Sequence, residues 1–159
     1  MSFSEIVSAT WALSNCNLEN FELNLPKLEN ATCMFGYSPK LTSVKLTTPK
    51  LKNASLMFYG CPKLTSVKID LTSLENAQNM FAGGCVLDET TAKDIIDQIK
   101  NKNECEVSPV SSLSFGTKKS LQTDQEFLDL CGVPSLSNGN WFTIQNKNGI
   151  SWQVQIYFQ

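Results

Sequence analysis

Few side chains of this sequence could take part in chemistry, because it contains no histidine. That absence excludes His-dependent nucleophilic triads, zinc sites with His ligands and the most frequent general base. Carboxylate pairs occur at 88–89 and 94–97, but they lie on or beside a segment with the pattern of a solvated amphipathic helix. Gly83-Gly84 lacks the Gly-Lys-Ser/Thr continuation of a phosphate-binding loop. We therefore predict no catalytic residue, no cofactor and no enzymatic activity.

Six cysteines raise the question of disulfides or a metal site. Their spacings contain no Cys-x-x-Cys pair, and the N-terminus shows no secretory signal that would imply an oxidising compartment. We favour reduced, buried thiols that pack as small apolar residues. The alternative is a bridge between Cys61 and Cys85, which adjacent repeats would bring together. No metal site is predicted.

A period of 23 residues organises the first half of the chain. Segments that begin at Leu28, Leu51 and Leu74 each start Leu-(Glu/Lys)-Asn-Ala and later contain Met-Phe. The second half of the unit, at 41–46 and 64–69, reads Leu-Thr-Ser-Val-Lys-(Leu/Ile) and has the apolar alternation of a strand. Apolar residues in the first half have the spacing of one helical turn. A fixed period of this size predicts a solenoid of short strands and helical returns.

The remaining sequence completes one predicted domain over residues 1–159. Residues 5–87 would form four 23-residue repeats, of which the first and last are degenerate because they end the stack. Residues 88–140 would be irregular, with helices at 88–100 and 123–130 and a strand at 112–115. A hairpin at 141–159 is indicated by Asn146-Lys-Asn-Gly149 between two apolar segments.

The segment Met-Phe-Tyr-Gly-Cys-Pro-Lys-Leu-Thr-Ser-Val-Lys-Ile at 57–69 resembles the repeat of the BspA-like leucine-rich-repeat family, where Ala-Phe-x-x-Cys-x-x-Leu-x-x-(Val/Ile)-x-(Leu/Ile) recurs. The resemblance covers residues 28–87 and extends back to residue 5. The region after residue 88 resembles the ends of short repeat proteins encoded by Bacteroidetes and their phages. Together these resemblances imply an α/β leucine-rich-repeat solenoid with a C-terminal β-hairpin cap and an adhesion-type binding function.

The strand face is the predicted binding surface, because every repeat contributes the same outward positions. The outward positions of successive strands are polar and include no aromatic residue that could stack on a sugar or a base. Residues 28–73 contain six lysines against two acidic residues, a net +4, while the whole chain carries −2. This band is either a site for an acidic partner or a solvated face copied with the repeat, and its lack of arginine argues against nucleic acid. The predicted partner-binding residues are Glu22, Ser43, Lys45, Thr47, Ser66, Lys68 and Asp70.

An apolar row in the last strand is too large to remain in water. At about 1.5–3 kcal/mol for each buried large side chain, the row is worth on the order of 10 kcal/mol. We predict that it caps the last repeat, and the alternative is a contact with another chain in an oligomer or virion. The predicted cap or oligomer contacts are Trp141, Ile150, Trp152, Val154, Ile156 and Phe158.

Two functional hypotheses follow. The first is a non-enzymatic recognition module that binds a protein or glycan through the strand face. The second is a structural or decoration subunit of a phage virion or another assembly, docked through the aromatic hairpin. Because the sequence shows no classical export signal and no segment approaching the roughly 20 apolar residues of a membrane span, we expect no membrane insertion. The protein would be cytoplasmic when made and associated with a virion under the second hypothesis.

Overall fold

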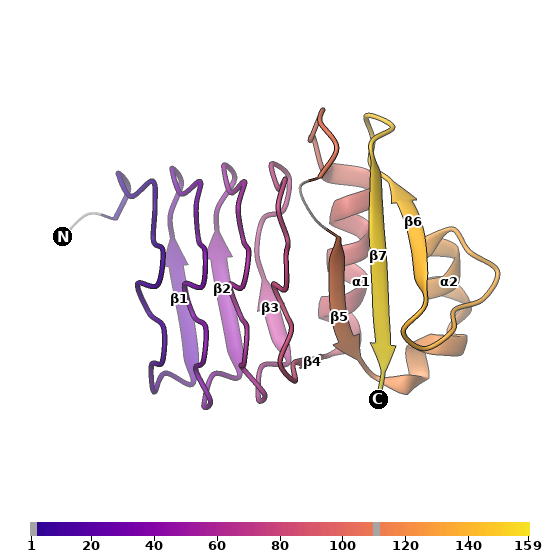
Figure 1. Cartoon of the computed structure of the whole chain (residues 1–159), viewed down its shortest axis with the longest axis horizontal. Helices are drawn as coiled ribbons and strands as arrows, with labels where there is room; N and C mark the ends of the chain where they lie inside the picture. The colour runs from indigo at the N-terminus through magenta and orange to yellow at the C-terminus, as the bar shows by residue number, and fades with distance from the viewer. Residues whose placement is uncertain (1–2, 110–111) are drawn as a thin grey trace.

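The computed structural model describes residues 3–109 and 112–159, so residues 1, 2, 110 and 111 of the predicted domain lie outside the description. The described residues form two separate β-sheets and two α-helices, with the first sheet in the N-terminal half and the second sheet and both helices in the C-terminal half (Figure 1). The first sheet contains the parallel strands β1 (Asn20–Asn24), β2 (Ser43–Thr47) and β3 (Ser66–Lys68).

The second sheet is mixed and has the strand order β4-β5-β7-β6. Strand β7 pairs in parallel with β5 and in antiparallel with β6, while the short β4 pairs in parallel with β5. Both helices lie behind this sheet in the view of Figure 1. The bounds are β4 Val86–Leu87, α1 Glu89–Asp97, β5 Leu113–Thr117, α2 Gln125–Cys131, β6 Trp141–Gln145 and β7 Ser151–Phe158.

The predicted leucine-rich-repeat solenoid is wrong, because the regular pattern gives only three paired strands and the chain then changes architecture. Where another strand would follow β3, residues Glu89–Asp97 form α1, and Asp88 begins this helix by accepting a hydrogen bond from the Thr91 N–H at 2.7 Å. Ala92 and Ile95 give α1 a buried apolar face, so helical spacing replaces strand spacing there. The fold is α/β with two sheets and not a regular repeat.

Within the first sheet, the 23-residue spacing of the sequence becomes the strand register. Asn20 lies beside Ser43, and Ser43 lies beside Ser66. The chain returns between strands through turn segments that carry Phe35, Phe58 and Phe81, whose rings stack at centroid distances of 5.6 and 5.5 Å. The core of this half therefore lies between the strands and the returning turn segments.

The C-terminal hairpin forms as β6 and β7, but it does not cap the last repeat as predicted. Strand β7 also pairs with β5, so the hairpin belongs to a four-stranded sheet. Helices cover one face of this sheet, and a π-helical turn at Gln98–Lys102 and a 3₁₀ turn at Lys119–Thr123 complete the connections. The apolar row of β7 packs inside this core, where Trp152, Val154, Ile156 and Phe158 are all buried.

Candidate functional site

The turn segments at 30–37, 53–60 and 76–83 are joined by a ladder of backbone hydrogen bonds. At alternate positions, an N–H of one segment donates to a carbonyl of the next segment along the chain. Because the repeats have equal length, the same four positions donate at each level. The bonds, 2.7–2.9 Å long, are Ala31 to Asn53, Cys33 to Ser55, Phe35 to Met57, Tyr37 to Tyr59, Ala54 to Asn76, Leu56 to Gln78, Phe58 to Met80 and Gly60 to Ala82.

Asn79, Phe81 and Gly83 occupy the last three of the four corresponding donor positions in the last turn segment. Their N–H groups have no hydrogen-bond acceptor within the described residues. The backbone still has the conformation of the earlier levels: φ is 53° at Asn79 and 56° at Leu56. Gly83 is required here, since a Cβ would lie 2.7 Å from the Gly60 nitrogen. We call these three N–H groups the open donor row.

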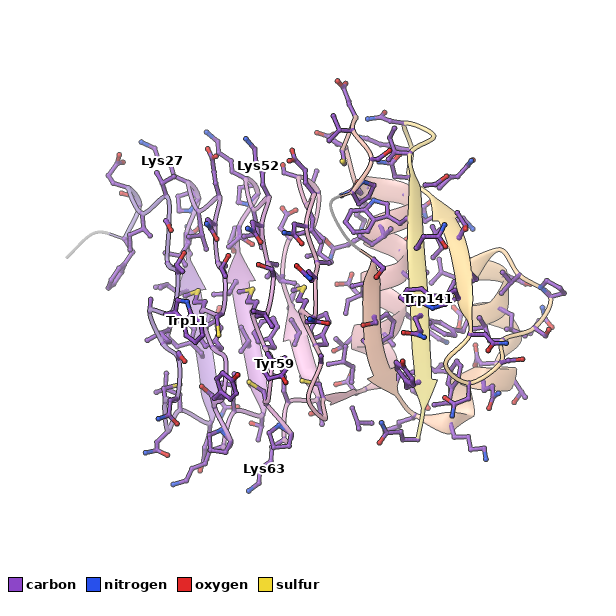
Figure 2. The ribbon with its side chains drawn as sticks, viewed as in Figure 1. Trp11, Lys27, Lys52, Tyr59, Lys63 and Trp141 are labelled. Atoms are coloured by element: carbon purple, nitrogen blue, oxygen red, sulfur yellow. The ribbon has the colours of Figure 1, made fainter. Side chains whose placement is uncertain are left out.

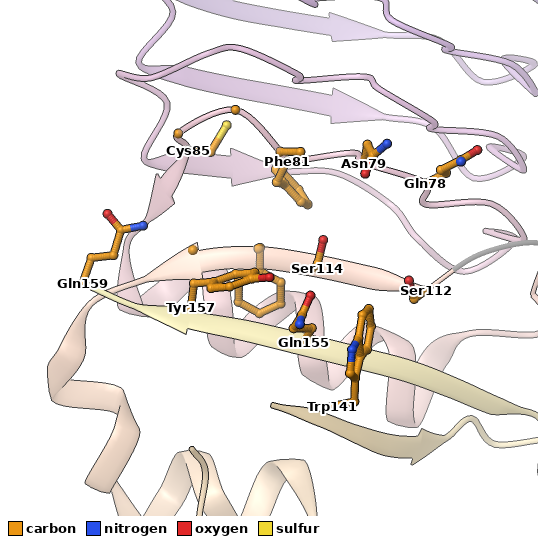
Figure 3. A pocket seen from close by; sticks show the side chains of 15 residues that line it. Gln78, Asn79, Phe81, Cys85, Ser112, Ser114, Trp141, Gln155, Tyr157 and Gln159 are labelled. Atoms are coloured by element: carbon orange, nitrogen blue, oxygen red, sulfur yellow. The ribbon is translucent and has the colours of Figure 1, made fainter. Parts of the chain in front are cut away.

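The open donor row lines a groove of about 560 Å³ between the last turn segment and the exposed face of the second sheet (Figure 3). Ser114 of β5 and Tyr157 of β7 belong to the opposite side, and Trp141 of β6 lies further along the same face. The rings of Phe81 and Phe115 meet edge to face, with centroids 6.5 Å apart, and both are buried beneath the groove.

Strand β5 forms the second wall and also has unpaired backbone. On its groove side it pairs with β4 only at Gly116 and Thr117. At that end the walls are in contact, since a Cβ on Gly116 would lie 2.6 Å from the Cys85 carbonyl oxygen. Further along, Leu113–Phe115 have no strand partner on this side in the described part of the chain. The groove thus runs between two lengths of backbone with unused hydrogen-bonding capacity.

The side chains that line the groove are mostly polar and uncharged. None of the described lining residues is Lys, Asp or Glu. Cys85 lines one end, but its thiol donates to the Cys61 and Phe58 carbonyls at 3.3 and 3.4 Å. Burial raises the pKa of this thiol to about 12, so it is protonated near neutral pH and is not an activated nucleophile. Polar amides, hydroxyls and two aromatic rings remain.

The predicted strand-face residues lie on one exposed surface, over which the chain satisfies many of its own polar groups. Lys45 pairs with Glu22 at 2.6 Å, and the Ser43 hydroxyl donates to Asn20 at 2.6 Å. Asp70 lies just beyond β3, where its carboxylate accepts the Thr72 N–H. The remaining predicted residues on this face are Thr47, Ser66 and Lys68. This surface is itself hollowed by a groove of about 500 Å³, lined in part by Glu22, Lys45 and Lys68, and it differs from the groove at the last turn segment in its charged lining and internal pairing.

The predicted basic band is spread over several surfaces and partly neutralised. Figure 2 shows Lys52 at one edge of the molecule and Lys63 at the opposite edge. Lys45 pairs with Glu22 at 2.6 Å, and Lys52 pairs with Glu29 at 3.5 Å. These pairs join consecutive repeats, but exposed ion pairs of this kind contribute only about 0–1 kcal/mol each. The lysines therefore form no single concentrated positive site.

The hairpin residues predicted as cap or oligomer contacts divide into two groups. Four are buried within the chain, as described above, and Ile150 is half-buried. Trp141 is 53% exposed and lies on the groove face of the second sheet, labelled in Figures 2 and 3. The apolar row is consequently unavailable to another chain, and Trp141 is the member that the structure leaves accessible.

The open donor row was missed in the sequence because a side-chain pattern carries no direct sign of an unfilled backbone group. One signal was present: the Met-Phe turn motif at 80–81 ends in Gly83-Gly84, and no further copy of the motif follows it. Each of the two earlier copies of this motif is hydrogen-bonded to the copy that follows it. The last copy has no following copy, so its N–H groups lack the carbonyls that a further repeat would provide.

All six cysteines are free thiols, so the alternative bridge between Cys61 and Cys85 is absent. Within residues 3–109 and 112–159, no cluster of three or more His, Cys, Asp or Glu side chains could hold a metal ion. Across the same residues, we find no helix with the length and apolarity needed to cross a bilayer.

No family model matches the sequence, and searches of curated proteins and of solved structures returned no significant match. The site must therefore be interpreted from its own geometry and chemistry.

Proposed function

We propose that this protein is a non-enzymatic recognition module that binds a partner molecule in the groove between the last turn segment and the second sheet. The observation that carries the proposal is the open donor row, which places along one wall of a groove three N–H groups that have no acceptor within the described residues. A ligand with carbonyl oxygens could accept from these groups, and a groove of this volume lies in the range of ligand sites.

This proposal moves the binding site away from the strand face, where the sequence placed it. The strand face forms ion pairs and hydrogen bonds within the chain, such as Glu22 with Lys45. A partner would have to break these contacts before making its own. In the groove, by contrast, the donors of Asn79 and Gly83 belong to exposed residues and need no rearrangement.

Two variants separate the two surfaces. Ser114→Arg places a long side chain in the groove, and the double variant Lys45→Glu/Lys68→Glu reverses charge on the strand face. We would screen the purified wild-type protein against a displayed random-peptide library and a glycan array, then test every ligand against both variants. Loss of binding in Ser114→Arg alone supports the groove. Loss only in the lysine variant, or in neither variant, contradicts the proposal.

A subunit of a larger assembly is the second candidate, supported by the N-terminal end of the ladder. There Val7 and Trp11 are 50% and 53% exposed, and Figure 2 shows Trp11 at that end of the molecule. The carbonyls of Thr10, Ala12 and Ser14 have no donor within the described residues. Assembly through this end predicts that Trp11→Ser lowers the mass measured by light scattering, whereas Ser114→Arg leaves it unchanged.

A further inference from the structure

We infer that the occupant of the groove is an uncharged polypeptide segment of a partner, bound lengthwise by its backbone between the last turn segment and β5. This inference rests on the proposed function, since it names the ligand class of the same site. It also specifies the contacts: three alternate carbonyls of the partner would accept from Asn79, Phe81 and Gly83.

The ladder itself identifies polypeptide as the ligand. At the two preceding levels, the same donor positions are filled by a segment of polypeptide chain that presents a carbonyl at every second residue. The acceptors for the donors of Leu56, Phe58 and Gly60 are Gln78, Met80 and Ala82. The backbone at 79–83 keeps the conformation of 56–60, with positive φ at Asn79 and Gly83 as at Leu56 and Gly60. The last turn segment therefore presents its N–H groups in the same way, and we expect them to donate to the same kind of partner, a row of backbone carbonyls.

The second wall extends this match. Residues Leu113–Phe115 of β5 have no strand neighbour on the groove side among the described residues, so an inserted segment would use its other edge to pair with them. A polypeptide has donors and acceptors on both edges and can satisfy the two walls together. A bound segment would therefore join the turn ladder to the second sheet.

The second sheet excludes a larger occupant. The two walls already meet where β4 pairs with β5, and Phe81 contacts Phe115 below the groove. A complete repeat of a second copy, with its own strand and core, has no room at this position. A single segment does, and the lack of Lys, Asp and Glu in the described lining favours one without charged side chains.

The test uses a synthetic peptide with the sequence of residues 76–83, Asn-Ala-Gln-Asn-Met-Phe-Ala-Gly, with both ends blocked. This sequence already covers the equivalent donors one level earlier in the chain. We would titrate it into ¹⁵N-labelled full-length protein and follow the amide resonances. The expected result is a saturable shift at Asn79, Phe81 and Gly83. Leu56, Phe58 and Gly60 provide the matched control, since their N–H groups are already bonded.

Two blocking variants and a competing ligand class make the result decisive. Ser114→Arg and Ser112→Arg should each weaken peptide binding by about tenfold or more, which corresponds to the loss of one or two hydrogen bonds. Two variants are used so that a folding defect in one does not decide the outcome. Shifts of the three amides by neutral oligosaccharides and not by peptide would overturn the inference while leaving the proposed recognition function intact. No shift with either class at millimolar concentration would overturn both.

Discussion

Gln98 completes the backbone hydrogen bonding of Leu71. Its side-chain oxygen Oε1 accepts the Leu71 N–H at 2.8 Å, while its Nε2 donates to the Ile69 carbonyl at 2.8 Å. At the equivalent place two repeats earlier, the Leu25 N–H donates to the carbonyl of Thr47 in the following repeat. The side chain of Gln98, at the C-cap of α1, thus supplies the acceptor that a further repeat would have supplied just beyond β3.

Replacing Gln98 by leucine tests this relationship. The variant keeps a side chain of similar size but leaves the Leu71 N–H and the Ile69 carbonyl buried without partners, so the free energy of unfolding should fall by about 2–4 kcal/mol. Urea denaturation measures the loss. The matched control is Gln125→Leu, which removes an exposed contact with Asp129 and should change stability by less than about 0.5 kcal/mol. Equal stability of the two variants would contradict the assigned role.

Trp152 and Trp141 test whether the hairpin is a core element or an assembly contact. Trp152 is fully buried and its Nε1 has no hydrogen-bond partner within the described residues, so Trp152→Ala loses packing and no hydrogen bond. The expected cost is about 3–5 kcal/mol, as for other buried aromatic residues. Trp141→Ala, at an exposed position, should cost under about 1 kcal/mol. A folded Trp152→Ala protein of unchanged stability but lower mass in light scattering would instead make the hairpin an assembly contact.

The local structure of the first sheet was predictable because equal spacing forces equivalent residues to become neighbours. The rows Asn20–Ser43–Ser66 and Glu22–Lys45–Lys68 of the structure are the rows that the sequence repeat gives. The end of the regular repeat was also indicated, because the sequence predicts a helix at 88–100 and α1 forms within that range from its Asp88 cap. The error was to treat the chain beyond this helix as part of one solenoid, where packing builds a separate sheet.

The second sheet could not be derived from local patterns. The strands of the hairpin were apparent from Asn146–Gly149, yet the pairing of Phe115 with Ile156 joins residues far apart in the sequence. An alternation of apolar and polar residues identifies a strand but does not indicate which other strand it pairs with. For the same reason the groove was invisible, because it exists only where Ser114 and Tyr157 are brought alongside Gly83 by that pairing.

The buried thiols predict a loss of stability at alkaline pH. Burial raises the pKa of Cys85 and of Cys131 from 9.0 to about 12. Below pH 9 both states keep the thiol protons, so the full stability is present; between pH 9 and 12 only the unfolded state releases them, and stability falls. Each thiol contributes a slope of up to about 1.4 kcal/mol per pH unit.

Urea unfolding under reducing conditions at pH 8, 9 and 10 measures this slope. Lysine side chains also begin to titrate at the upper end of the range, so the comparison is with the double variant Cys85→Ala/Cys131→Ala, in which the lysines remain. The variant should be less stable at pH 8 but should lose less stability on going to pH 10. Parallel curves for the two proteins would show that these thiols do not cause the pH dependence.

Hydrogen exchange distinguishes the open donor row from the filled one in the free protein. Phe58 and Phe81 form the sharpest comparison, because both rings are buried and both residues hold the same place in their turn segments. Within the part of the chain that the structure describes, only the Phe58 N–H of the two has an acceptor. The Phe81 amide should exchange about a hundredfold faster or more, since no local hydrogen bond must open before it exchanges. Leu56 against Asn79 and Gly60 against Gly83 repeat the comparison, and NMR resolves each amide. If Phe81 were protected as strongly as Phe58, some group would already cover the row, and the groove would be closed to a partner.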